Sequence, residues 1–157
     1  MNAIPTLPPI EGDLAHRVVG LWRLISREDH DDEGVRRIDP VMGPNPLGML
    51  VFGPSRFAAQ FMNPDRSAAP SVAVSSGPNN SGAVNGYDAY FGSYTLDAAV
   101  GKVTVKLEGG LSVANIGQAF VRDIRADQRN LWIQLRTSAT DGTPVTRTLT
   151  FVRDGTG

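Results

Sequence analysis

The three tyrosines of the chain lie close together in the sequence. Tyr87, Tyr90 and Tyr94 fall within eight residues of a run that alternates like a β-strand. On a strand, Tyr90 and Tyr94 share one face with Gly92 between them, where glycine leaves room for a ligand ring. A phenol in a dry pocket can donate a hydrogen bond to a carbonyl or enolate oxygen and stabilise developing charge. Tyr90 and Tyr94 are therefore candidate catalytic residues, and packing in the core with bonded hydroxyls is the equally open alternative.

Glu108 is the candidate acid or base for such chemistry. It shares a strand face with two lysines and a threonine, which indicates solvent. Gly109 and Gly110 follow directly, and they could mark a bulge that turns the carboxylate inward. An inward Glu108 would be the natural general base, whereas an outward one would be an ordinary surface residue.

A single amide interrupts an otherwise apolar strand upstream. Phe57, Ala59 and Phe61 alternate on one face of residues 56–62, whereas Gln60 lies on the other face beside Met62. Ligand cavities are mainly apolar with a few placed polar groups, and an amide offers both a donor and an acceptor. Gln60 is therefore a candidate ligand-binding residue, unless its face meets water.

The strand ends in the polar turn Asn63-Pro64-Asp65-Arg66, which is expected at the mouth of a cavity. Arg66 either contacts a ligand there or pairs with Asp65 or Asp88 at the surface. Residues 63–86 form a long segment without clear periodicity, and loops of that length are usually functional or mobile. We expect this segment to act as a lid.

Composition excludes several classes of function. The 157 residues carry a net charge of −1, with 41% hydrophobic and 20% charged residues, so no general attraction to nucleic acid is expected. No apolar run approaches the roughly 18 residues of a membrane span. The absence of cysteine and of a secretory signal pattern at the start makes the cytoplasm the expected location.

No cofactor or metal is expected. The sequence has no glycine-rich nucleotide motif and no serine-nucleophile elbow. Its two histidines, His16 and His30, occur in unlike settings, which argues against a histidine-rich metal site. The acidic run at residues 29–34 resembles the start of a calcium loop, but the position that needs a bidentate glutamate is Pro40.

Seventeen glycines and eleven prolines separate short apolar runs, a pattern typical of many brief strands. Residues 1–12 are expected to form an extended Pro-rich arm, and residues 13–157 a single domain. That domain begins with a helical turn capped by Asp13 and ended by Gly20. The sequence predicts an all-β fold, a closed antiparallel up-and-down barrel of eight or nine strands, with a two-sheet sandwich as the alternative. The strands are expected at residues 21–28, 35–39, 48–52, 56–62, 87–96, 102–108, 117–124, 131–137 and 145–153.

Several motifs resemble the lipocalin-like domain family of bacteria and fungi. The resemblance spans residues 17–153 and rests on the runs GLWRLIS at residue 20, NPLGML at 45, AQFM at 59, YDAYFGSY at 87 and FVR at 151. The chain has Val105-Lys106 where relatives tend to have a histidine pair. The resemblance implies a barrel with a ligand-sized interior. It also implies that Trp22 plugs one end and that an arginine covers its face, with Arg153 as the first candidate and Arg147 as the second.

Two functional hypotheses follow, and a third stays open. In the first, the barrel binds a small hydrophobic or aromatic molecule in its central cavity. Its candidate ligand-binding residues, which mix both strand faces, are Gln60, Arg66, Phe52, Phe61, Met62, Phe91 and Phe120. In the second, the same cavity serves a cofactor-independent isomerase, cyclase or lyase that uses Glu108, Tyr90 and Tyr94. In the third, the barrel is packed solid and has a structural or partner-binding role. A homodimer also stays open, because the Pro-rich start could be a disordered arm or a strap across a neighbouring subunit.

Overall fold

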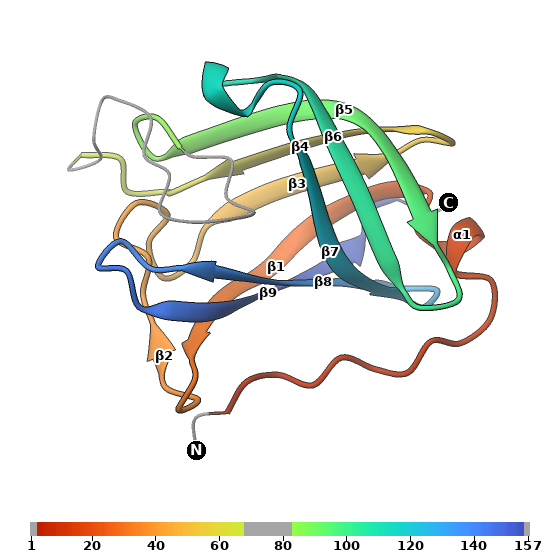
Figure 1. Ribbon diagram of the computed structural model, residues 1–157, viewed down its shortest axis with the longest axis horizontal. Coiled ribbons are helices and arrows are strands. Elements are labelled where there is room, and N and C mark those ends of the chain that lie inside the picture. Colours follow the sequence, from red (N-terminus) through yellow and green to blue (C-terminus); the bar gives the residue numbers. More distant parts are fainter. Residues whose placement is uncertain (1–2, 68–82, 156–157) are drawn as a thin grey trace.

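A computed structural model describes residues 3–67 and 83–155, and within them the chain forms a closed barrel (Figure 1). β1 pairs antiparallel with β3, each strand from β3 to β8 pairs with the next, and β9 pairs back with β1, so the sheet closes on itself. The short β2 forms a hairpin with the far end of β1. The predicted barrel is confirmed and the sandwich alternative is wrong. The strands are β1 (Gly20–Asp31), β2 (Arg36–Arg37), β3 (Leu47–Phe52), β4 (Arg56–Met62), β5 (Tyr87–Asp97), β6 (Lys102–Gly110), β7 (Ala119–Ala126), β8 (Asn130–Ser138) and β9 (Pro144–Arg153).

A short helix precedes the barrel, and a single 3-10 turn, η1 (Val113–Asn115), lies between β6 and β7. Helix α1 (Leu14–Arg17) begins after Asp13, whose carboxylate accepts a hydrogen bond from the His16 amide at 3.2 Å. Leu14 on the helix and Val18 just after it are buried beneath one end of the barrel. The N-cap therefore fixes the helix where it can close that end.

Trp22 fills this closed end of the barrel. Its indole N–H donates to the Val18 carbonyl at 2.9 Å, and the Arg153 guanidinium lies 4.2 Å from the ring centroid. Arg153 also donates to the carbonyls of Arg17 and Val19, which ties the last strand to the helix. Gly20 has a φ of 145°, and a side chain there would collide with the Arg153 guanidinium. The glycine two residues before the tryptophan thus leaves the space that the Arg153 guanidinium occupies over the Trp22 ring.

The N-terminal arm lies against the outside of its own barrel. Residues 3–12 have no regular secondary structure, and Figure 1 shows them running beneath the sheet from α1. The Gln134 side chain on β8 donates to the Pro5 carbonyl at 2.8 Å, and Arg125 on β7 donates to the Pro8 carbonyl at 3.0 Å. The arm therefore lies over part of the outer face of β7 and β8.

One seam of the barrel wall is only partly paired. The ladder between β1 and β3 ends at Arg23 and Met49, whereas β3 continues along β4 as far as Leu47. The other edge of β1 stays paired with β9 from Trp22 to Asp31, with a register shift between Leu24 and Ser26. β1 and β3 consequently separate next to Gly48. Among the described residues, no helix is both long and apolar enough to cross a membrane.

Candidate functional site

Aromatic side chains pack the middle of the barrel. The Tyr90 ring lies 5.9 Å from the Phe57 ring and 6.4 Å from the Phe61 ring, centroid to centroid. The gap that these side chains and their apolar neighbours leave has a volume of about 20 Å³, enough for about one water molecule. This gap therefore leaves no ligand-sized space, and the central cavity stays a prediction. Phe52, also expected to contact a ligand, is buried in this packing against Phe57.

A buried arginine meets Tyr90 inside the barrel. Nη1 of Arg122 on β7 donates to the Tyr90 hydroxyl at 3.2 Å. The same guanidinium lies 5.5 Å from the centroid of the Phe120 ring and 6.0 Å from that of Tyr90. Tyr90 and Phe120 thus point inward, as expected of cavity residues, and both contact the Arg122 guanidinium.

Four charged side chains hold the opposite end, the mouth of the barrel. Arg147 on β9 forms two hydrogen bonds with Asp29 on β1, at 2.8 and 3.0 Å, and both side chains are buried. Arg27 pairs with Asp39 at 3.1 Å. Burial opposes the ionisation of Asp39, but Arg27, the Val41 amide and Arg147 together hold the pKa of its carboxyl below the usual value. These charges compensate each other, so the cluster fastens loop 38–46 to the barrel.

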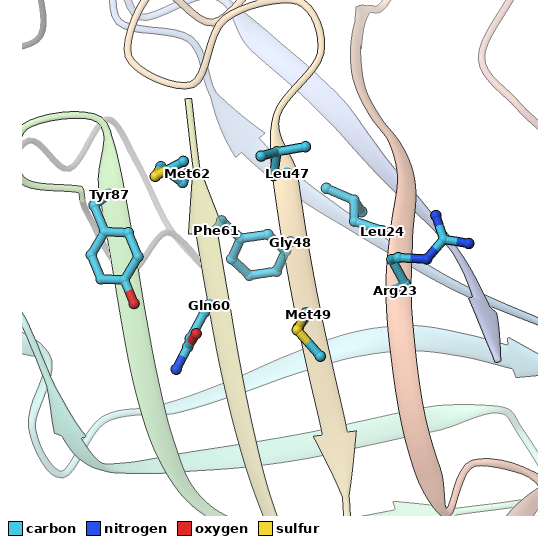
Figure 2. A pocket seen from close by; sticks show the side chains of 9 residues that line it. All are labelled: Arg23, Leu24, Leu47, Gly48, Met49, Gln60, Phe61, Met62 and Tyr87. Carbon is cyan, nitrogen blue, oxygen red and sulfur yellow. The ribbon is translucent and has the colours of Figure 1, made fainter. Parts of the chain in front are cut away.

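A hollow of about 340 Å³ opens in the barrel wall where β1 and β3 separate (Figure 2). Gly48 has no side chain, and a Cβ there would lie 2.7 Å from the Phe61 ring and 3.1 Å from Leu24. Those two inward side chains therefore form part of the lining. Outward side chains from four neighbouring strands complete it. The lining residues are Arg23, Leu24, Leu47, Gly48, Met49, Gln60, Phe61, Met62 and Tyr87.

Three polar side chains stand among the apolar ones of this hollow. Gln60 on β4 and Tyr87 on β5 lie on adjacent strands, and Figure 2 shows the tyrosine ring reaching toward the level of the amide. Arg23 lies on β1, on the far side of Met49 from Gln60. The arrangement combines an apolar surface with hydrogen-bonding groups on one side and a cation on the other.

One known family matches most of the chain. The model of a family described as a lipocalin-like domain matches residues 19–153. The chain belongs to the lipocalin-like domain family. No curated protein matches its sequence. A lipocalin-like fold supports a ligand-binding barrel in general, so the question is which part of this barrel can take a ligand.

The side hollow of this lipocalin-like barrel brings together three of the predicted ligand-binding residues, Gln60, Phe61 and Met62. Arg66 lies next to them, because its guanidinium is 5.9 Å from the centroid of the Tyr87 ring and donates to the Asn85 carbonyl at 2.7 Å. The amide that interrupts strand β4 therefore faces neither bulk solvent alone nor the central cavity. It faces an apolar hollow on the outside of the wall.

The predicted catalytic set is not assembled. The expected bulge exists, because Phe91 pairs with Gly109 and Gly92 with Leu107, which leaves Glu108 as the extra residue. Its carboxylate nevertheless points outward and pairs with Arg56, with 41% of the side chain exposed. Of the two alternatives, Glu108 therefore takes the surface one, where its negative charge has the Arg56 cation as a partner across the sheet.

Three further candidates lie outside the hollow. Tyr94 donates its hydroxyl hydrogen to the Gly53 carbonyl at 2.5 Å, near the closed end, and burial raises the pKa of its phenol. Phe91 lies on the outer face, 54% exposed, with its ring over Gly109. Arg147, the second candidate to cover Trp22, belongs instead to the mouth cluster.

Sequence reasoning missed Arg23, Leu47 and Met49 as lining residues, although alternation along their strands already put all three on one face. The expected lid at residues 63–86 falls largely on residues 68–82, which lie outside the described residues. Across residues 3–67 and 83–155, no group of three or more histidine, aspartate or glutamate side chains is arranged to hold a metal ion.

Proposed function

We propose that this protein is a binding barrel that takes a small, mostly apolar or aromatic molecule in the side hollow of its wall. One observation carries the proposal: the volume of about 340 Å³, which falls in the range of about 300–1,000 Å³ typical of ligand sites. The described core side chains leave only about 20 Å³ between them. Of these two spaces, the one beside Gly48 has the volume of a ligand site, which supports the side hollow as the place of binding.

The lining sets the chemistry of the ligand. Leu24, Met49 and Phe61 favour an aliphatic or aromatic body, since burying apolar surface contributes about 25 cal/mol per Å². Gln60 can both donate and accept a hydrogen bond, and the Tyr87 phenol can donate one to a carbonyl or hydroxyl oxygen. Arg23 suits a carboxylate or a similar anion on the opposite side. The expected ligand is therefore a compact ring system that carries one or two oxygen-containing groups.

Binding has more support than catalysis. Among the described residues that line the hollow there is no carboxylate and no histidine, which leaves the Tyr87 phenol as the side chain of a kind used in general acid–base catalysis. Glu108 pairs with Arg56 outside the hollow, and Tyr90 is not among the residues that line it. The isomerase, cyclase or lyase alternative therefore lacks the converging groups that it requires.

Two fluorescent probes with related ring systems test the proposal. Phenylnaphthylamine is neutral, whereas anilinonaphthalene sulfonate adds an anion. Met49→Lys is expected to weaken the neutral phenylnaphthylamine about tenfold or more, because it brings a charge into the apolar hollow. Arg23→Gln is expected to weaken only the sulfonate probe, about fivefold.

Arg129→Gln is the matched control, since it removes the same charge from an exposed residue in the turn between β7 and β8. It should leave both affinities unchanged. If phenylnaphthylamine binds wild type and Met49→Lys with equal affinity, it binds elsewhere, and the hollow would then lose its proposed role.

A further inference from the structure

One outer face of the barrel is strongly apolar, and none of the described segments covers it. Its residues are the outward-pointing side chains of β1, β3, β4 and β5, which we call the bare face. The register places Leu21, Val51, Ala58 and Phe91 in one row across these strands. The large apolar side chains of this face are 39–56% exposed, namely Leu21, Ile25, Leu47, Met49, Val51 and Phe91.

The outer face of β7 and β8 differs, because the N-terminal arm lies over part of it. Hydrogen bonds from Gln134 and Arg125 to the carbonyls of Pro5 and Pro8 hold the arm there. Exposed patches of this size rimmed by polar residues mark interaction sites. The Arg56–Glu108 ion pair lies next to the Phe91 row and supplies such a rim.

We propose that a second copy of this chain packs its bare face against this one, and that the two faces together enclose the side hollow. The inference that the second copy closes the hollow over a bound ligand rests on the proposed function. The pairing of the two bare faces does not. Ligand sites usually bury 70–90% or more of a small molecule. A single sheet face provides one wall only, so the site is complete when a second face lies over it.

The exposed area suits a dimer. If a fully exposed large apolar residue presents roughly 150–200 Å², exposures of 39–56% leave on the order of 500 Å² on these six side chains. A stable interface needs about 800 Å² per partner. Gln60, Arg23, Met62 and Tyr87 lie among the apolar side chains and would supply the remainder.

The face is also compatible with twofold symmetry. The middle row contains Arg23, Met49, Gln60 and Ala89, and the rows on either side of it are apolar apart from the Tyr87 hydroxyl. A twofold axis in the plane of the interface leaves the middle row opposite itself and brings apolar rows onto apolar rows. The polar groups of the two copies then meet at the centre, next to the hollow. The contact is isologous, so it closes at two copies.

Sedimentation velocity on three proteins tests the pairing. Val51 is 40% exposed on the bare face but does not line the hollow, whereas Val121 is 49% exposed on β7. Wild type and Val121→Lys should sediment as dimers, and Val51→Lys should sediment as a monomer whose far-ultraviolet circular dichroism spectrum is that of the wild type. A wild type that is monomeric over the whole concentration range, or a Val51→Lys protein that remains dimeric, would overturn the inference.

Phenylnaphthylamine binding then separates the two proposals. The monomeric Val51→Lys should bind the probe at least about tenfold more weakly than Val121→Lys, although its hollow is intact. If it binds equally well, the hollow is complete in one chain, and closure by the second copy is wrong while the proposed function stands. If wild type is a dimer that loses its pairing in Val51→Lys yet binds no probe, the proposed function fails and the pairing stands.

Discussion

The buried ion pair at the mouth offers a sharp test of how the barrel is held. Asp29 and Arg147 are both buried, and two hydrogen bonds of 2.8 and 3.0 Å join them. Replacing Asp29 with asparagine leaves the guanidinium with Asp39, 3.8 Å away, as the nearest carboxylate. Breaking a buried pair costs about 3–5 kcal/mol. Because Asp39 remains, we expect the lower end of that range, a loss of about 3 kcal/mol in the free energy of unfolding.

Urea unfolding followed by the fluorescence of Trp22 and Trp132 measures this loss. The matched control is Asp32→Asn, which breaks the exposed pair with Arg136, where both side chains are more than half exposed. Because solvent screens that pair, its loss should destabilise the protein far less than the loss of the buried pair. If Asp29→Asn destabilises the protein no more than Asp32→Asn does, the mouth cluster does not stabilise the fold as argued.

Three further outcomes are expected from other parts of the structure. Asp39 has a lowered pKa in the folded protein, so its stabilising contribution should be complete above about pH 4, the unfolded value. The contribution should be lost as the pH falls through the folded pKa. In a series of thermal midpoints measured against pH, Asp39→Asn should therefore reduce the fall in midpoint at acid pH. Arg153→Met removes the cation over Trp22 and should cost about 1–2 kcal/mol in urea unfolding, and a cost near zero would contradict the role of that contact. Gly48→Ala places a methyl group against Phe61 and should cost about 1–3 kcal/mol and weaken phenylnaphthylamine; unaltered stability and binding would show that the lining is not as tight as described.

The features that sequence predicted well have local causes. Asp13 caps the helical turn, and the alternation of short apolar runs between glycines and prolines indicated the strands. The resemblance added Trp22 and its covering Arg153, and the structure has that contact. Each of these depends on neighbours in the chain or on a recurrent motif.

The candidate site could not be predicted in the same way, because it depends on pairing between distant segments. The side hollow exists because the ladder between β1 and β3 stops at Arg23 and Met49, a register that no local pattern specifies. The bulge at Glu108 was anticipated, but its outward direction depends on Arg56, which is 52 residues away in sequence. Asp29 and Arg147 lie 118 residues apart, so neither suggested its partner.

The methyl signals of the methionines give the most direct test of where a ligand binds. Met49 and Met62 line the hollow, whereas Met42 is buried in loop 38–46 at the mouth. In the protein labelled with carbon-13 at the methionine methyl groups, phenylnaphthylamine should shift the signals of Met49 and Met62 through the ring current of the naphthalene and leave that of Met42 in place. A shift of Met42 with Met49 and Met62 unchanged would place the ligand at the mouth and contradict binding in the side hollow.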